Sequence, residues 1–417
     1  CNFIVTLEAF THNILHDHID YEKGNNPNET KDYKDGNFNV PYLSMEFLRE
    51  LQNNPSFANE QEQLVTVKPD DILLLWDGSK AGEFIRGKHG ALSSTMAKLF
   101  NLGNNNWDYI YYLLKIHEDY LQNNTRGMGI PHVDTKLLKN LSLPIPPVKE
   151  QKMIAKFLDR ETSRIDRLIE KKEKLIDLLE EKRTALISKT VTKGLDPGVE
   201  MVESGEEIIG EIPAHWDIST LGNISLKLTN GYVGPTRDIF VEDGIPYIQS
   251  THIEDGQIKF EGEYFVSKEW SQKHSNSTLK KGDVLIVQTG DVGECAVVPK
   301  NLEGANCHAL IIARTANVID GLYLNLFLQS NIGKDLLNSL QTGATLKHLN
   351  TTRVKDVIIP IPPKEEQDKV INYLKGEQRD KEKMIMDITK GIDLLQEYRA
   401  ALISAAVTGK IDVRGEV

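Results

Sequence analysis

Long hydrophobic runs are absent from this 417-residue chain. Nowhere do about 18 consecutive apolar residues occur, so no membrane-spanning helix is expected, and no secretory signal pattern opens the sequence. Cysteine is scarce too, because Cys1, Cys295 and Cys307 are the only three and no Cys-x-x-Cys spacing exists. This scarcity argues against a disulfide framework and a cysteine zinc site, and it suits a reducing cytoplasm.

Motifs that carry chemistry are also missing. No Gly-x-Gly-x-x-Gly follows a strand, and no Gly-x4-Gly-Lys-Ser/Thr phosphate loop occurs. The segment 54–57 lacks the second proline of an Asn/Asp-Pro-Pro-aromatic methyltransferase motif, and Gly290–Gly293 is typical of a turn between strands. His12, His16 and His18 have no second pair of ligands, which favours a solvated segment over a metal site. The sequence therefore predicts a binding protein, with no catalytic, cofactor-binding or metal-binding residues.

The net charge of −12 seems to oppose binding to nucleic acid. Residues 193–217, however, carry one basic and seven acidic side chains, a balance of −6, which is half of the total. The charge of the whole chain therefore does not exclude a basic surface elsewhere.

A block of 54 residues occurs twice, 216 positions apart. The copies span residues 143–196 and 359–412, begin with Pro144-Ile145-Pro146-Pro147 and Pro360-Ile361-Pro362-Pro363, and share 23 identical positions without a gap. Between the copies lie long segments that differ much more. One unit used twice predicts internal two-fold symmetry, with a scaffold retained and two heads that diverged.

Each copy continues as a helical pattern after its paired prolines. Apolar residues recur every three or four positions over roughly six heptads, which is typical of a long helix with one apolar stripe. We expect two helices of roughly 45 residues, each about 65–70 Å long at 1.5 Å per residue. Pro147 and Pro363 suit first-turn positions, where a missing N–H costs nothing.

A helix with one apolar stripe needs a partner, and the other copy is the expected one. The predicted coiled-coil seam consists of Ile154, Leu158, Ile165, Leu168, Leu175, Leu179, Leu186, Val370, Leu374, Met384, Ile388, Leu395 and Leu402. Lys172 and Lys381 interrupt the stripe, and polar seam residues help to fix register and partner. Two-fold symmetry makes the helices antiparallel, with the two heads at opposite ends and residues 193–210 joining the first helix to the second head.

The two heads resemble each other in outline. Residues 67–74 and 279–286 each read as a turn followed by a buried strand, and each strand leads into a glycine-containing loop, at 77–82 and 289–293. Short amphipathic helices are expected at 109–120 and 322–337. Gly127 and His132 match Gly343 and His348 at the same offset of 216, so the duplication extends into the heads.

Together these motifs resemble the specificity subunit of type I restriction–modification systems, over essentially the whole chain. The resemblance rests on the paired Pro-Ile-Pro-Pro-x2-Glu-Gln starts, the helix ends at 183–188 and 399–404, and the segment 407–412. Residues 212–216, followed by Leu221-Gly222, and residues 343–350 also match the family. The first head departs from the pattern, because no counterpart of the 212–222 entry is visible before it.

The resemblance implies an α+β fold with two similar mixed target-recognition domains separated by an antiparallel helical coiled coil. The expected divisions are target-recognition domain 1 at 1–142, helical spacer 1 at 143–196, an acidic linker at 197–211, target-recognition domain 2 at 212–358, and helical spacer 2 with its tail at 359–417. Each domain would read one half of a split, asymmetric DNA site, with the helices setting the gap.

The resemblance also implies partners in a bacterial or archaeal cytoplasm. Two adenine-specific methyltransferase subunits would dock on this chain, and motor–nuclease restriction subunits would join them. S-adenosylmethionine would bind to the methyltransferase, and this chain would hold no cofactor.

Contacts to DNA require basic or hydrogen-bonding side chains on loops, because phosphate contacts position a protein and contacts to base edges specify the sequence. The candidates are Ser79, Lys80, Arg86, Lys88, Arg126 and His132 in the first head, and Thr236, Arg237, Gln249, Ser250, Thr251, His252, Thr345, Lys347 and His348 in the second. Each could instead be a solvated side chain, and His132 and His348 could be structural histidines.

A second hypothesis stays open from the sequence. A coiled-coil scaffold that joins two proteins and never touches DNA would show the same repeat. Purification together with an adenine methyltransferase, followed by salt-dependent binding to duplex DNA, discriminates between the two.

Overall fold

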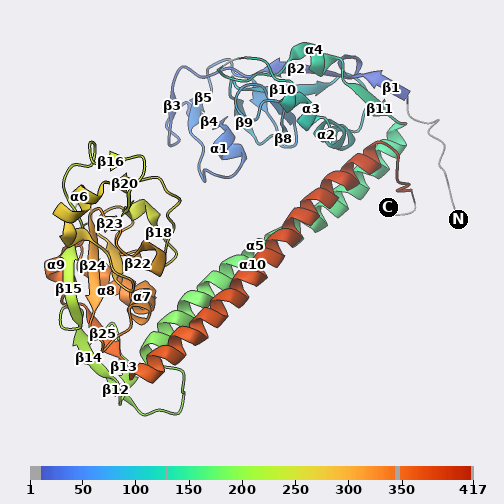
Figure 1. Cartoon of the computed structure of the whole chain (residues 1–417). Helices are drawn as coiled ribbons and strands as arrows, with labels where there is room; N and C mark the ends of the chain where they lie inside the picture. Colours follow the sequence, from blue (N-terminus) through green and yellow to red (C-terminus); the bar gives the residue numbers. More distant parts are fainter. Residues whose placement is uncertain (1–10, 128, 343–347, 415–417) are drawn as a thin grey trace. The chain divides into compact units, whose positions relative to one another are not determined.

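The computed structural model describes residues 11–127, 129–342 and 348–414. The chain divides into two compact units: unit 1 comprises Cys1–Lys172 with Thr389–Val417, and unit 2 comprises Glu173–Ile388. Each unit contains one mixed α/β head and a part of each of two long helices (Figure 1). The expected α+β fold, with an internal repeat and two long helices, is confirmed.

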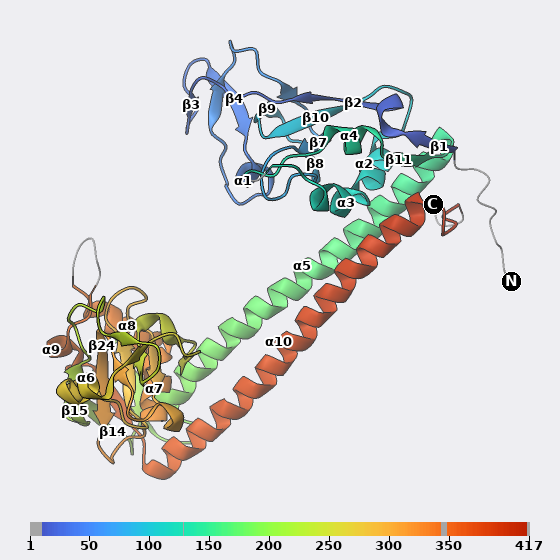
Figure 2. The same cartoon turned by 45° about the horizontal axis from the view of Figure 1, so that its top comes forward.

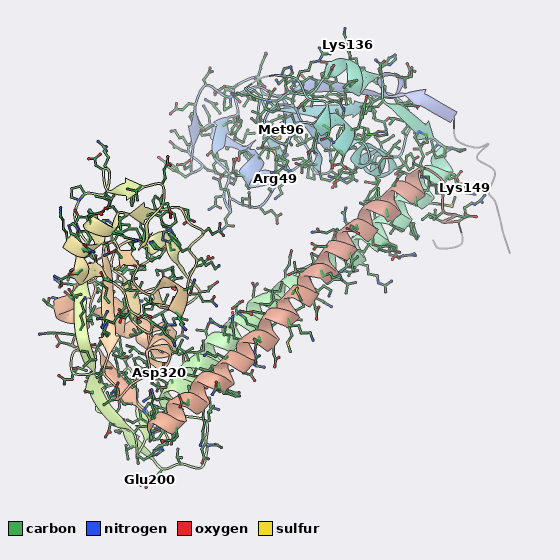
Figure 3. The ribbon with its side chains drawn as sticks, viewed as in Figure 1. Arg49, Met96, Lys136, Lys149, Glu200 and Asp320 are labelled. Atoms are coloured by element: carbon green, nitrogen blue, oxygen red, sulfur yellow. The ribbon has the colours of Figure 1, made fainter. Side chains whose placement is uncertain are left out.

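The first head is built around an antiparallel sheet in the order β2-β10-β7-β8. Its strands are β2 (Ile19–Lys23), β10 (Met96–Asn101), β7 (Ile72–Leu75) and β8 (Phe84–Arg86). All four residues of β7 are buried, as the run of apolar residues predicts for a central strand. Met96, labelled in Figure 3, is fully buried on the neighbouring strand.

A second sheet of the first head has the order β3-β5-β4-β9-β6, in which β4 and β9 are parallel. Its strands are β3 (Thr30–Lys31), β5 (Phe57–Asn59), β4 (Phe38–Leu43), β9 (Gly90–Leu92) and β6 (Thr66–Val67). The helices of this head are α1 (Met45–Leu48), α2 (Trp107–Lys115), α3 (Glu118–Asn123) and α4 (Thr135–Lys139).

The second head repeats both sheets. Its antiparallel sheet has the order β15-β24-β21-β22, and its other sheet, β16-β20-β17-β23, again contains one parallel pair, β17 and β23. The strands are β15 (Ser225–Asn230), β24 (Leu310–Thr315), β21 (Val284–Val287), β22 (Cys295–Val297), β16 (Phe240–Val241), β20 (Phe265–Val266), β17 (Ile245–Ile248) and β23 (Asn306–Cys307). The matching strand orders show that the duplication extends through the heads.

Smaller elements complete the second head. Its helices are α6 (Lys268–Lys273), α7 (Gly321–Gln329), α8 (Asn331–Ser339) and α9 (Thr351–Val354), with a short 3-10 helix η3 (Ser250–His252). Two hairpins add the strands β12 (Met201–Glu203) with β13 (Glu211–Pro213), and β18 (Ile253–Glu254) with β19 (Gln257–Ile258). The segment expected to be an acidic linker thus contains the first of these hairpins.

The chain enters both heads in the same way. Strand β14 (Asp217–Thr220) pairs with β25 (Ile358–Ile361), and β1 (Thr11–Ile14) pairs with β11 (Ser142–Ile145). The N–H of Leu221 donates to Val357, and the N–H of Leu15 donates to Leu141 at the corresponding place. The first head therefore has the entry strand, although its sequence lacks the entry motif.

The amphipathic segments predicted in each head form two helices rather than one. In the second head, Ser330 leaves helical backbone conformation and its hydroxyl accepts from the N–H of Gly333, which ends α7 and caps α8. In the first head the division between α2 and α3 falls at Ile116 and His117.

The long helices are α5 (Val148–Lys193) and α10 (Lys364–Val407), each beginning one residue after its second proline. At 46 and 44 residues they are about 69 and 66 Å long. They lie side by side and antiparallel within each unit (Figures 1 and 2). In unit 1 Arg399 pairs with Asp166 at 2.9 Å, and in unit 2 Lys381 pairs with Glu180 at 2.8 Å.

The predicted seam needs correction at three positions. Leu168, Leu175 and Met384 are 41%, 45% and 52% exposed, whereas the neighbouring Ile169, Ile176 and Ile385 are half-buried. The other ten predicted seam residues are buried or half-buried. Both predicted polar interruptions face the other helix: a Cβ on Gly391 would lie 2.9 Å from Nζ of Lys172, and Lys381 binds Glu180.

Buried glutamines explain part of the repeated motif at the helix starts. Oε1 of Gln367 accepts from the N–H of Asp320, labelled in Figure 3, and its Nε2 donates to the carbonyls of Val318 and Pro362. Gln151 makes the equivalent bonds to the N–H of Asn106 and the carbonyl of Pro146. Each glutamine thereby joins the start of a long helix to the loop before α2 or α7.

Buried tyrosines bind the ends of the same helices. The hydroxyl of Tyr109 donates to the carbonyl of Val407 at 3.1 Å, and that of Tyr323 donates to Val191 at 3.0 Å. Burial raises the pKa of both phenols, so they stay protonated donors. Each unit thus packs its head on the start of one long helix and the end of the other, within a shared hydrophobic core.

Candidate nucleic-acid interface

Two loops meet at one edge of the main sheet in the first head. We name residues 77–82, after β7, the glycine loop, and residues 126–132 the hairpin loop. Backbone bonds between Arg126 and His132 close the hairpin loop, at 2.9 and 2.8 Å. The N–H of Gly78 donates to the carbonyl of Pro131 at 2.9 Å, which joins the two loops.

The second head brings together the corresponding loops, 289–293 and 342–348. Thr342 and His348 exchange backbone bonds, and the N–H of Leu349 donates to the carbonyl of Gln288. The hydroxyl of Thr289 lies 2.9 Å from Nδ1 of His348. The structure thus places the described ends of the corresponding loops at the same position in both heads.

Several predicted DNA-contacting residues meet on these loops. Ser79 and Lys80 are exposed on the glycine loop of the first head, where Arg126 is exposed and His132 half-buried on the hairpin loop. His348 is exposed on the second head. Thr345 and Lys347 lie outside the described residues.

Arg86 and Lys88 are not on this edge, and as DNA contacts they stay predictions. The guanidinium of Arg86 binds Asp108 at 2.7 Å and lies 4.2 Å from the centre of the Tyr111 ring. Nζ of Lys88 binds Glu50 at 3.0 Å. Both charges are therefore already paired within the head, so displacing either partner would oppose a contact to phosphate.

The remaining candidates of the second head lie on two other segments. Thr236 and Arg237 follow β15, and Arg237 is exposed, while Gln249, Ser250 and Thr251 surround the start of η3 with partly or fully exposed side chains. No hydrogen bond or ion pair described for these residues joins them to the paired loops. They stay predictions.

His252 requires a further correction. Its side chain is 5% exposed, and Nδ1 accepts from the N–H of Gln249 at 3.0 Å while Nε2 lies 3.5 Å from Glu263. Burial lowers the pKa of this imidazole, although Glu263 acts in the opposite direction. A buried ring that caps η3 is a structural histidine rather than a DNA contact.

The structure adds candidates that sequence reasoning missed. Lys136, labelled in Figure 3, and Lys139 are exposed on α4 just after the hairpin loop, and Lys23 pairs with Asp77 of the glycine loop at 2.8 Å. Lys355 follows α9 at an offset of 216 from Lys139. That repeated offset was the available signal for these two lysines.

The helices also border a groove within unit 2. It has a volume of about 700 Å³, and apolar side chains from α5, α7 and α10 line it, among them Leu186, Leu326 and Leu374. Charged residues including Arg183, Lys375 and Glu382 surround the apolar part. Such a surface can bind another protein.

Among the described helices, none combines the length and apolarity needed to cross a bilayer. Likewise, within the described ranges no three His, Cys, Asp or Glu side chains cluster closely enough to hold a metal ion.

Comparison with known proteins identifies the family. The type I restriction modification DNA specificity domain matches twice, at residues 14–180 and 213–384. The MjaVIII specificity subunit of Methanocaldococcus jannaschii is 31% identical over 405 residues, covering 95% of this chain and 92% of that protein. The EcoBI specificity subunit of Escherichia coli is 24% identical, covering 82% and 73%.

Solved structures share the fold. A chain from a study of complex assembly and conformational transition of the type I R-M system has a TM-score of 0.70 at 16% identity, over 97% of this chain and 98% of that one. The HsdS subunit from Thermoanaerobacter tengcongensis has a TM-score of 0.51 at 15% identity, over 97% of both. The chain therefore belongs to the type I restriction–modification DNA specificity family and carries two copies of its domain.

Proposed function

We propose that this chain is the sequence-reading subunit of a type I restriction–modification complex, in which each head reads one half of a split, asymmetric DNA site. The observation that carries the proposal is the repeated pair of loops at one sheet edge, built on the same scaffold with different side chains. On this proposal the paired helices set the distance between the half-sites.

The two hairpin loops suggest a division of labour. His132 and His348 occupy equivalent positions, whereas Arg126 corresponds to Thr342 at the other side of the loop. A residue shared by two heads suits a contact to phosphate, which is the same in every sequence, and residues that differ suit base edges. The exposed lysines near the loops would add further contacts to phosphate.

Partners would supply the chemistry. Two adenine-specific methyltransferase subunits would dock on the helices and heads, with the groove of unit 2 as one docking surface, and motor–nuclease subunits would join them. The chain itself would not be an enzyme. S-adenosylmethionine would bind to the methyltransferase subunit, in the cytoplasm of a bacterium or archaeon.

Binding to duplex DNA at several salt concentrations tests the proposal, using the chain purified with its methyltransferase partner. Replacing Lys80 by alanine should lower affinity and reduce the slope of log Kd against log salt by about one for the phosphate that is no longer neutralised. Lys88→Ala is the matched control, because this lysine is paired with Glu50.

Equal slopes for the wild type and Lys80→Ala would contradict the placement of the interface. A chain that binds the methyltransferase but shows no affinity for DNA, alone or in the complex, would support the scaffold hypothesis instead.

A further inference from the structure

The hairpin loop of the first head holds an apolar side chain in solvent. Ile130 is 70% exposed, at the edge where Ser79, Lys80 and Arg126 are also exposed. A single exposed isoleucine on a protein surface is ordinary. This one differs because backbone hydrogen bonds close the loop that carries it and attach that loop to the glycine loop.

Three features fix the backbone around Ile130. The pair Arg126–His132 closes the loop, and the bond from Gly78 to Pro131 attaches it to the glycine loop. Because a proline follows, Ile130 is restricted to extended backbone conformations. Gly127 has a φ of +105°, and a Cβ there would lie 2.5 Å from the carbonyl oxygen of Ile130, so glycine is required.

The charges beside Ile130 indicate what it contacts. Lys80 is exposed and, among the described residues, forms no ion pair, so its ammonium can bind an anion. Arg126 is also exposed, and its guanidinium forms an ion pair with Asp134, the N-cap residue of α4. Duplex DNA presents phosphates beside an apolar group, the 5-methyl of thymine, which aliphatic side chains contact in the major groove.

We propose that Ile130 is a specificity-determining residue of the first head and packs on the methyl group of a thymine in its half-site. The inference rests on the proposed function and names one base feature that this head reads. Lys80 binds a neighbouring phosphate, and the bonds that close the hairpin loop hold Ile130 at this edge.

The contact is tested by replacing the thymines of the half-site with deoxyuridine, one at a time. Each replacement removes only the 5-methyl group. The probe is the duplex bearing the half-site that changes when the first head is exchanged, and the protein is the complex with its methyltransferase. The wild type should bind about fourfold more weakly when one particular thymine is replaced, the factor expected for one buried methyl group.

Ile130→Ala should weaken binding to the unmodified probe and should no longer distinguish thymine from deoxyuridine at that position. Ile130→Val should retain part of the discrimination. Leu102→Ala is the matched control, because Leu102 is 57% exposed on the same head at the opposite end of the β2–β10 pair.

The assignment is overturned if Ile130→Ala retains the full sensitivity to deoxyuridine, or if the half-site contains no thymine. It is also overturned if 2-aminopurine in the half-site brightens with the wild type and not with Ile130→Ala, since Ile130 would then unstack bases as a wedge. A complex with no sequence preference at all would instead contradict the proposed function.

Discussion

At the scale of single residues, a few side-chain hydrogen bonds attach each head to the start of a long helix. Gln151 and Gln367 each satisfy backbone groups from two segments, and the carboxylate of Glu366 accepts from Trp216 Nε1 at 2.9 Å and lies 2.7 Å from His215 Nε2. The repeated glutamine, and Glu366 of the second copy, are therefore explained by docking rather than by chemistry. These residues stay fixed while the loops that they position vary.

Replacing Gln367 by leucine should destabilise unit 2 by about 2–3 kcal/mol, because the N–H of Asp320 and two carbonyls would be left without their buried partner. Amide hydrogen exchange at Asp320 and along the first turns of α10 measures the effect. Gln396→Leu, on the exposed part of the same helix, is the control. Unchanged protection of Asp320 in Gln367→Leu would contradict the docking role.

The buried imidazole of His252 makes the stability of the second head depend on pH. Its pKa is lowered from 6.5 by burial, so the unfolded chain binds a proton more readily than the folded head. The stabilisation is therefore fully present above pH 6.5 and is lost as pH falls below that value. Titration of the ring by NMR should give a pKa below 6.5, and a value at or above 6.5 would refute this explanation.

At the scale of elements, the sequence predicted the long helices and missed the rotation of their seam. Leu168 and Ile169, like Leu175 and Ile176, are adjacent apolar pairs, so periodicity alone allowed either residue on the inside. The exposures decide between them, because Ile169 and Ile176 are half-buried whereas Leu168 and Leu175 are 41% and 45% exposed.

The heads were predictable only in part, for a physical reason. The buried strands β7 and β21 were predictable from local runs of apolar residues. Their neighbours β10 and β24 pair with them across long sequence separations, which the local pattern does not encode. The pairing of the two loops was likewise not predictable from local pattern, because it depends on a hydrogen bond between Gly78 and Pro131, which are far apart in the sequence. The ion pairs of Arg86 and Lys88 and the burial of His252 were not predicted, because pairing and burial depend on tertiary contacts.

An aspartate at the seam tests the corrected rotation of α5. Ile176→Asp should destabilise the helix pair by about 2 kcal/mol or more, because a charge would be placed on the half-buried side without a partner. Leu175→Asp, one position away on the exposed side, should change stability by less than about 0.5 kcal/mol. Thermal unfolding followed by helical circular dichroism compares them, and equal effects would restore the original seam.

At the scale of the whole molecule, a duplicated unit of head and long helix carries two different recognition surfaces. Both heads have the same strand order in the main sheet, the same paired loops, and equivalent glutamine and tyrosine contacts to the long helices. The helical block kept 23 of its 54 positions identical while the loops diverged. This contrast favours two heads with different targets on a common scaffold.

Mapping modified adenines in cells tests that claim most directly. Cells should carry this chain with its methyltransferase subunit, either unchanged or with residues 11–141 replaced by the first head of a relative. The unchanged chain should give a split motif, and the exchange should alter one half of the motif while leaving the other half intact. A motif that survives the exchange unchanged, or that changes in both halves, would contradict the assignment of one half-site to each head.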